Sequence, residues 1–418
     1  MTQSPQSTNA LTPQLVDRLW QEAQALRAPM VAFATRLIQT PSLPGAEAEV
    51  ATLVVKEMHA LGYDMVEVDE AGNVIGTIRV SPRQPSTEGP AHRRIMFNTH
   101  MDHVDPGDPA RWPYPPYGGV VHNDQIWGRG ASDLKGALAA QVYAGAVLKR
   151  LGLPIPGEIY VACVVLEELG GLGSAVLAER LPVDYVILGE PSGNQLALGH
   201  RGRIEIAVTI TGKSVHASVP ETGVNPLYSM SNFLLALKDL KFEADPAHPD
   251  LGPTTIAPTL VGTDQTSPNV VPGECRLTLD VRNSPADEPQ AILSRVEELL
   301  QASLEPGATG RAAIPPFTLT SYTGLSRTLS GHGAYGVPPD SPPALLARSI
   351  LSTALRREVP AKMWRFATDA GYFVQKGAIV LGFGPGYEQV IHTVEEHISI
   401  PMMVEAVVGC AALALALT

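Results

Sequence analysis

The sequence is poor in cysteine and in basic residues. It has three cysteines, an odd number, without the close spacing of a zinc knuckle or a thioredoxin motif: Cys163, Cys275 and Cys410. This usage favours a reducing compartment. The 30 basic residues are outnumbered by 42 acidic ones, the formal net charge is -12, and no basic patch is present. Because nucleic-acid binding depends on clustered Lys and Arg, we expect no nucleic-acid partner.

We also expect no export signal and no membrane span. Residues 1–15 do not show the basic start and apolar core of a secretory signal. The most apolar stretch, Val404 to Thr418, has 15 residues, fewer than the ~20 that cross a bilayer. We therefore expect a cytoplasmic protein with no membrane partner.

What the sequence does contain is typical of a folded enzyme with two domains. Hydrophobic residues make up 44% of the chain and charged residues 17%, values within the globular range. Its 418 residues exceed the roughly 250 to 300 at which a single core stops growing. We expect a catalytic domain in two parts, residues 1–202 and 323–418, with a second domain, residues 203–322, inserted between them.

Helical and strand patterns alternate through the first 202 residues. Apolar positions recur at helical spacing in residues 12–38 and 48–61, which we interpret as two helices. Further along, the pattern predicts strands at 95–99, 157–166 and 184–190 and helices at 136–151 and 173–180. This βαβ rhythm predicts an α/β fold with a mostly parallel sheet flanked by helices.

The pattern changes near residue 204. Ile204 to Thr211 alternates with period two, as in a sheet with one solvated face. The segments that follow are predicted to be a helix at 224–241, strands at 254–263 and 274–282, a helix at 287–303 and a strand at 314–321. The resulting βαββαβ order is that of a ferredoxin-like α+β domain. The chain then returns to the catalytic domain, with a helix near 344–357, a strand at 378–383 and a final apolar helix.

Several histidines and carboxylates follow the predicted strands. His100 and Asp102 lie two residues apart at a strand end, so their side chains point the same way. A metal-bound histidine commonly pairs with a carboxylate, although Asp102 could equally form a turn. Asp133 precedes a helix in GRGASDLKGALAA and is by itself best explained as a helix cap.

Two adjacent acids, Glu167 and Glu168 in LEELGG, follow a buried strand. Neighbouring side chains on an extended segment face opposite ways, so one can bind a metal while the other faces a water. Two acids on a solvated loop are the alternative. Glu190 ends another strand and His392 follows the last one. The candidate ligands thus gather at strand carboxyl ends, where open α/β sheets build their sites.

The motifs around these residues occur in a recognisable order: THMDHV, GRGASDLKG, LEELGG, GEPS, GHRGR, GKSVHAS, SPNVVPGECRLTLDVR, TDAGYF, and GFGPG with IHTVEEH. Over nearly the whole chain they resemble the M20 family of co-catalytic zinc peptidases and deacylases. That group includes acetylornithine deacetylase, succinyl-diaminopimelate desuccinylase and carboxypeptidase G2. The resemblance implies a zinc-peptidase-like catalytic domain and an inserted lid domain through which the chain forms a homodimer.

The resemblance also implies a site with two divalent metal ions. His100 and Glu190 would bind one ion, Glu168 and His392 the other, and Asp133 would bridge them. Histidine and carboxylate ligands without cysteine suit zinc, although cobalt or manganese could substitute. The peptide bond after Asp133 is expected to be cis.

Further roles follow from the same resemblance. Glu167 would be the general base, and Asp102 would orient the neighbouring histidine ligand. His216 would reach across the dimer and stabilise the oxyanion in the partner's site. Asn269 and Arg282 would bind substrate, with the guanidinium suited to a carboxylate. Without the resemblance, His216 would be interpreted as an exposed lid residue and Arg282 as part of a solvated face.

We therefore expect a metal-dependent amidohydrolase that cleaves the amide bond of a small N-acyl amino acid, as a deacetylase or desuccinylase of amino-acid metabolism does. A carboxypeptidase or dipeptidase acting on short peptides is the alternative within the family. A non-hydrolytic metal- or ligand-binding protein on the same scaffold is the alternative outside it. Phe366 and Ala367 replace two glycines of many relatives, and Gly371 stands where an Arg is frequent, so the resemblance does not specify the substrate.

Overall fold

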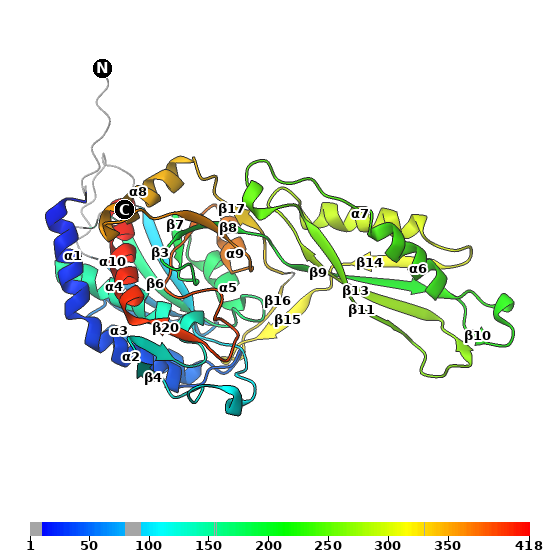
Figure 1. Ribbon diagram of the computed structural model, residues 1–418, viewed down its shortest axis with the longest axis horizontal. Coiled ribbons are helices and arrows are strands. Elements are labelled where there is room, and N and C mark those ends of the chain that lie inside the picture. The colour runs from blue at the N-terminus through cyan, green and yellow to red at the C-terminus, as the bar shows by residue number, and fades with distance from the viewer. Residues whose placement is uncertain (1–10, 80–92, 154, 156, 330) are drawn as a thin grey trace, which may run out of the picture.

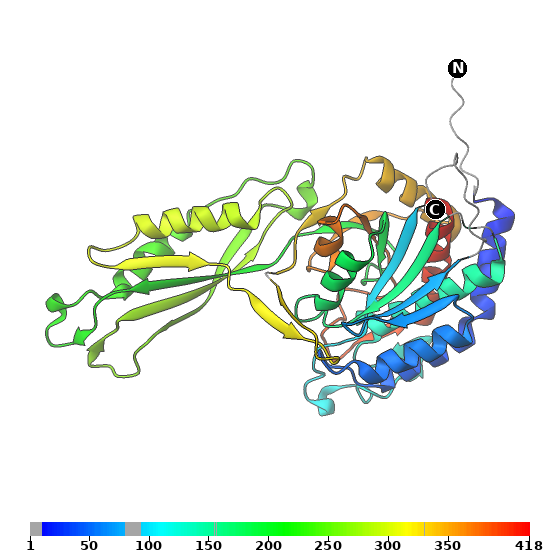
Figure 2. The same ribbon diagram turned by 180° about the vertical axis from the view of Figure 1, so that it is seen from behind.

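The computed structural model describes residues 11–79, 93–153, 155, 157–329 and 331–418. Residues 1–10, which belong to the segment considered for an export signal, lie outside these ranges. The described chain has two parts, a broad sheet covered by helices and a narrower extension that carries the second domain (Figures 1 and 2).

Nine strands of the described chain form the main sheet. They are β1 (Met65–Val68), β2 (Val74–Ile78), β3 (Arg94–His100), β6 (Glu158–Val164), β7 (Tyr185–Leu188), β8 (Leu196–His200), β17 (Tyr335–Gly336), β18 (Ala361–Trp364) and β19 (Ile379–Gly382). Their order is β1-β2-β6-β3-β7-β19-β8-β17, with β18 paired to β8. Strands β6, β3, β7 and β19 are parallel, and β1, β2 and β17 pair antiparallel. The predicted parallel sheet is confirmed at the centre, while its edges make the whole sheet mixed.

Helices cover both faces of this sheet, as predicted. One face carries α1 (Pro13–Ala25), α2 (Arg27–Gln39), α3 (Ala48–Ala60), α4 (Gly136–Leu151), α8 (Pro342–Leu355) and α10 (Ile400–Leu417), and the other carries α5 (Leu172–Arg180) and α9 (Ala370–Val374). Helix α4 is buried along nearly its whole length and packs against α10. The central strands are therefore buried on both sides, which explains their continuous apolar runs.

The final helix α10 begins before the predicted apolar stretch and is 18 residues long. By length and composition alone it could cross a membrane, but 83% of it is buried inside the protein. It packs there against α1, α4 and α8. Its apolar side chains are thus used by the core, as in a central helix of a globular domain.

The first predicted helix is wrong in one respect, because residues 12–38 contain two helices. Helices α1 and α2 are separated at Leu26. Pro29 lies in the first turn of α2 and has no N–H to bond a carbonyl four residues earlier, so one continuous helix would lose that bond. Apolar residues recur at helical spacing on both sides of Leu26, so this pattern does not reveal the break.

The second domain has the predicted ferredoxin-like order. Its elements are β9 (Ile204–Thr211), α6 (Pro226–Leu237), β11 (Thr255–Thr263), β13 (Glu274–Arg282), α7 (Pro289–Ala302) and β14 (Thr309–Ala313). The strands are antiparallel in the order β11-β13-β9-β14. Alternate residues of β9 and β13 are buried with residues of α6 and α7, which accounts for the period-two pattern. Strand β11 forms an edge of this lid sheet and is mostly exposed.

The predicted strand at 314–321 is present in part, at Phe317–Thr320, but its assignment to the lid sheet is wrong. The fourth strand of the lid sheet is β14, and it is followed by Pro315 and Pro316, which cannot donate hydrogen bonds to a strand ladder. The chain then forms a separate ribbon of β15 (Phe317–Thr320) and β16 (Ser326–Leu329). This ribbon returns to the catalytic part, where the Tyr322 hydroxyl donates to the Gly72 carbonyl at 3.0 Å.

Two small sheets complete the described strands. Strands β4 (Val120–His122), β5 (Gln125–Trp127) and β20 (His397–Ser399) form one of them. Strands β10 (Val215–His216) and β12 (Val270–Val271) form the other, at the end of the lid far from the main sheet (Figure 1).

Candidate metal centre

The predicted ligands meet at one edge of the main sheet. His100 ends β3, Glu168 follows β6, Glu190 follows β7, and His392 follows β19. These four strands are parallel neighbours, so their carboxyl ends lie side by side. Asp133 comes from the helical turn η2 (Ala131–Lys135) immediately before α4. The sheet order thus brings together residues that are up to 292 positions apart in the chain.

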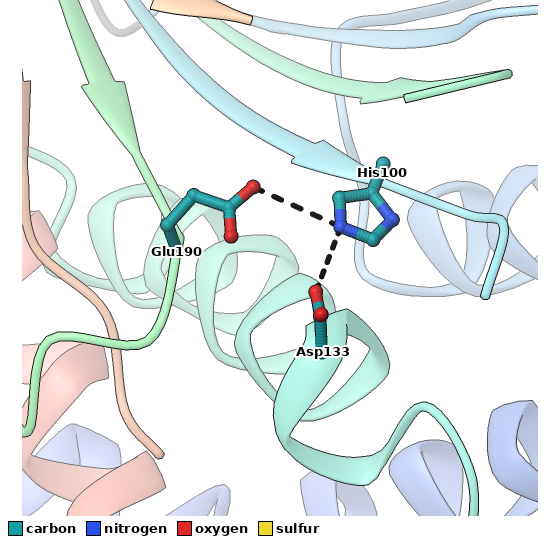
Figure 3. A group of neighbouring side chains, drawn as sticks. All are labelled: His100, Asp133 and Glu190. Carbon is teal, nitrogen blue, oxygen red and sulfur yellow. Dashed lines mark hydrogen bonds and ion pairs between the residues drawn. The ribbon is translucent and has the colours of Figure 1, made fainter. Parts of the chain in front are cut away.

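Asp133 is shared by two groups of potential metal ligands. In the first, Nε2 of His100 lies 3.0 Å from Asp133 Oδ1 and 3.7 Å from Glu190 Oε1 (Figure 3). In the second, Nε2 of His392 lies 3.0 Å from Asp133 Oδ2 and 3.2 Å from Glu168 Oε2. The two oxygens of Asp133 therefore face different histidines, as a carboxylate bridging two ions would.

The chemistry of these residues fits a pair of divalent ions. Within each group the donor atoms lie within 4.8 Å of one another. Three carboxylates and two histidines offer only oxygen and nitrogen donors, the set used by zinc, cobalt and manganese. Buried carboxylates without compensating charge are costly, and two divalent ions with a hydroxide would neutralise all three.

Burial and mutual charge shift the pKa values in this site. Hydrogen bonds with Asp133 and Glu168 raise the pKa of His392 to about 10. Burial raises the pKa of Glu190 well above its usual range. Burial also acts to raise the pKa of Asp133, but hydrogen bonds with His100 and His392 outweigh it, and the net shift is downward. The site therefore favours positive charge, which protons on the histidines or divalent ions can supply.

Asp102 supports the site through both its backbone and its side chain. Nδ1 of His100 donates to the Asp102 backbone carbonyl at 3.0 Å, which leaves Nε2 free to bind a metal. The Asp102 carboxylate lies 3.6 Å from the same Nδ1. It also accepts hydrogen bonds from the backbone N–H groups of Glu167 and Glu168, each at 3.1 Å. One buried carboxylate thus positions the loop that carries both acids.

Residues 96–416 match the family model described as peptidase family M20/M25/M40. The chain belongs to this family. Protein YgeY of Escherichia coli K12 is 28% identical over 381 residues, which cover 90% of this chain and 91% of that protein. The succinyl-diaminopimelate desuccinylase of Cereibacter sphaeroides is 27% identical over 383 residues, covering 88% and 94%. The crystal structure of aminopeptidase PepT from Bacillus cereus is similar in fold, with a TM-score of 0.72, 20% identity, and coverage of 94% and 99%.

Membership makes this M20 chain a hydrolase of a metal-dependent family of peptidases and amidohydrolases, as predicted. The peptide bond between Asp133 and Leu134 is cis, as the resemblance implied. Two residues of the site have a φ of 58°, a conformation uncommon outside glycine. They are Leu166, which precedes Glu167, and the candidate ligand His392. The Leu166 N–H donates to the buried Glu47 carboxylate at 3.1 Å, a support that sequence reasoning did not identify.

A second buried carboxylate that sequence reasoning missed holds Asp133 in place. Glu396 accepts hydrogen bonds from the backbone N–H groups of Ser132 and Asp133, both at 3.0 Å. Arg129 pairs with its other oxygen at 2.6 Å. Glu396 is buried, whereas its neighbour Glu395 in VEEH is exposed. Nothing in the sequence distinguishes these two glutamates, since only the fold decides which one faces the Asp133 turn.

Two of the predicted lid residues, His216 and Asn269, lie far from the metal centre of their own chain (Figure 1). His216 is exposed on β10 at the distal end of the lid, where its Nδ1 contacts Ser218 Oγ at 2.7 Å (Figure 1). Asn269 is its neighbour, because the Ala217 N–H donates to the Asn269 carbonyl at 2.9 Å. Arg282 lies at the other end of the lid sheet, because it ends β13, about 27 Å from Glu274 at ~3.4 Å per residue.

The GHRGR and TDAGYF motifs of the M20 resemblance contribute contacts that hold the chain segments around the site. His200 ends β8 and bonds Thr368 Oγ1 through Nε2 at 2.8 Å, and burial lowers its pKa to about 3. Gly371 packs against the backbone of Gly333, so that a Cβ atom there would lie 2.8 Å from it. The absence of a long side chain at position 371 is thus required by this close approach of two segments.

Proposed function

We propose that this M20 hydrolase cleaves the amide bond of a small N-acyl amino acid at a pair of divalent ions. The single observation that carries the proposal is the sharing of Asp133 between two ligand groups, each completed by one histidine and one glutamate. His100, Glu190 and Asp133 would hold one ion, and His392, Glu168 and Asp133 would hold the other. We propose zinc for both positions, with cobalt or manganese able to replace it.

The residues around the ions supply the remaining chemistry. The ions, when bound, would polarise the scissile carbonyl and lower the pKa of the attacking water. Glu167 follows β6 beside the ligand Glu168 and belongs to neither ligand group. Its carboxylate takes the proton of the water and delivers it to the leaving nitrogen, and Asp102 holds its backbone in place for this transfer.

A substrate with a carboxylate suits the positive charge of Arg282, which lies on the side of the lid next to the main sheet. Arg282 lies at the end of β13 near the main sheet, and its forked donors suit a carboxylate. It donates to Asp280 through Nε at 2.7 Å and through Nη2 at 3.5 Å, and within the described residues Nη1 makes no hydrogen bond and can donate to a ligand. The relative from Cereibacter sphaeroides is a desuccinylase of an amino acid derivative, which supports the same substrate class. A free amino acid carboxylate is therefore the group that we propose Arg282 binds.

The catalytic test compares N-acetyl amino acids, N-succinyl amino acids and dipeptides with zinc-loaded protein. Glu167→Gln should lower kcat by about 10²- to 10⁴-fold and retain the two ions that share Asp133, because it removes the proton acceptor and none of their ligands. Glu298→Gln, an exposed change on the lid helix α7, is the matched control and should retain full activity. Removal of metal by a chelator should abolish hydrolysis, and zinc should restore it. Full activity of Glu167→Gln would refute the mechanism, and preference for dipeptides would replace the deacylase proposal with the peptidase alternative.

We also propose a homodimer through the lid, in the cytoplasm. The edge strand β11 exposes Leu260 and Val261, and an unpaired apolar edge is a site for strand pairing. Two β11 strands paired antiparallel would join the lid sheets of two chains. His216 and Asn269 lie at the distal end of the lid and reach a metal centre only if that centre belongs to the partner subunit. The three cysteines are free and buried, in agreement with a reducing compartment.

A change at this edge tests the dimer. Leu260 is 70% exposed, so Leu260→Lys adds a charge without disturbing the core and should give monomers in sedimentation. If His216 acts in the partner's site, activity should fall with the dimer fraction. Leu345→Lys on α8, where the side chain is 51% exposed, is the control and should leave both unchanged. A fully active monomer would contradict the role of His216 across the dimer.

A further inference from the structure

A third group of metal-binding side chains lies beside the two described above. Donor atoms of Glu167, His332 and Asp369 lie within 4.8 Å of one another. They come from three separate segments: the loop after β6, the chain between β16 and β17, and the residue that precedes α9. Nδ1 of His332 is 3.7 Å from Asp369 Oδ1. None of the three belongs to the two groups that share Asp133, although Glu167 is the chain neighbour of the candidate ligand Glu168.

Asp369 is buried without the partners that a buried carboxylate requires. It is 1% exposed, and neither of its carboxylate oxygens makes a hydrogen bond of normal geometry. The Ser174 hydroxyl is close enough to lower its pKa, yet burial raises that pKa to about 6. Among the described residues no Lys or Arg forms an ion pair with Asp369 or Glu167. Native structures rarely leave such a group uncompensated, which points to a cation at this position.

His332 is prepared to act as a ligand. Burial, followed by the nearby charges of Arg203 and Arg282, lowers its pKa to about 4, so the imidazole is neutral with a free lone pair. Nδ1 of His332 has no hydrogen-bond partner. The imidazole also has a hydrogen bond with the Thr368 backbone, which acts to raise its pKa. A backbone partner on one nitrogen and a free second nitrogen is the arrangement of a metal-bound histidine. Both arginines form ion pairs with Asp280, so they do not neutralise the carboxylates of Glu167 and Asp369.

We propose that Glu167, His332 and Asp369 form a third divalent-cation site whose occupation inhibits hydrolysis. One nitrogen and two carboxylate donors suit zinc. This site should be weaker than the other two, because it lies close to two bound cations that repel a third. Inhibition follows because an ion on the Glu167 carboxylate prevents that group from accepting a proton. This consequence, though not the binding itself, depends on the function proposed for Glu167.

Metal binding tests the site independently of activity. Metal-depleted protein is titrated with zinc in a calorimeter, and bound metal is counted by elemental analysis. The native chain should bind two ions tightly and a third more weakly. His332→Gln and Asp369→Asn should each retain the two tight ions, which also shows that they fold, and should weaken the third by at least about tenfold, since even outer partners of a ligand contribute that much. His59→Gln, an exposed change on α3, is the control and should bind all three.

Activity at increasing zinc then tests the inhibition. Above the concentration that fills the first two positions, native activity should fall, and the inhibitory midpoint should be at least about tenfold higher in His332→Gln. The proposal is overturned if the native chain binds only two ions, or if the third binds both variants as tightly as the native chain. Three bound ions in a chain that hydrolyses no amide would support the site and reject the proposed function instead.

Discussion

The buried pair of Glu396 and Arg129 provides a sharp test of how this fold holds its metal centre. Glu396→Gln keeps the shape of the side chain and one oxygen that can accept from the Ser132 and Asp133 backbone. It removes the negative charge opposite Arg129, whose N–H lies 2.6 Å from the carboxylate. Burial, and then the charge of Asp133, raise the pKa of Glu396 to about 7. Measurements at pH 8 therefore compare an ionised carboxylate with a neutral amide.

The expected magnitude follows from burial. The side chains of Arg129 and Glu396 are 3% and 0% exposed, so the substitution leaves a buried, unpaired cation, which costs about 3 to 5 kcal/mol of unfolding free energy. Arg150 and Glu22 form a pair with the same 2.6 Å separation, but they are 50% and 26% exposed. Glu22→Gln is thus a matched control and should cost no more than about 1 kcal/mol.

Urea unfolding of metal-free protein measures this difference, and competition with a chelating dye measures zinc affinity. Because Glu396 positions the turn that carries Asp133, Glu396→Gln should also weaken zinc binding by about 10- to 100-fold. Glu22→Gln should leave zinc affinity unchanged. Equal effects of the two substitutions on stability would refute the argument from burial. Unchanged zinc affinity in Glu396→Gln would show that the Asp133 turn is held by other contacts.

Two further predictions concern the segments next to the centre. Because burial lowers the pKa of His200 to about 3 from its usual 6.5, only the unfolded chain binds this proton between those values, and stability is lost as pH falls through this window. His200→Asn should therefore reduce the slope of unfolding free energy against pH by up to about 1.4 kcal/mol per unit between about pH 6 and 4, and an unchanged slope would contradict it. Gly371→Ala should destabilise by about 1 to 3 kcal/mol, because its Cβ would meet Gly333, whereas Gly262→Ala, with open space around it, should not.

The sequence by itself determined the class of fold and the identity of the candidate ligands. Apolar runs of strand length between helical patterns predict a sheet covered on both faces, because strands buried on both sides consist mostly of apolar residues. Period-two alternation from Ile204 predicts the lid sheet, because a sheet with one buried and one solvated face alternates apolar and polar residues. Histidines and acids placed just after such runs predict a site, since the carboxyl ends of parallel strands lie on one edge.

Only the tertiary structure decided which groups face one another. The break at Leu26 and the end of the lid sheet at Pro315 depend on backbone hydrogen bonds that apolar periodicity does not report. Glu395 and Glu396 are equivalent in the sequence, and packing alone buries the second against Arg129. His332 and Asp369 lie in separate segments whose approach depends on how the chain returns from the lid. Contacts of this kind are set by strand order and close packing, and neither is local in the sequence.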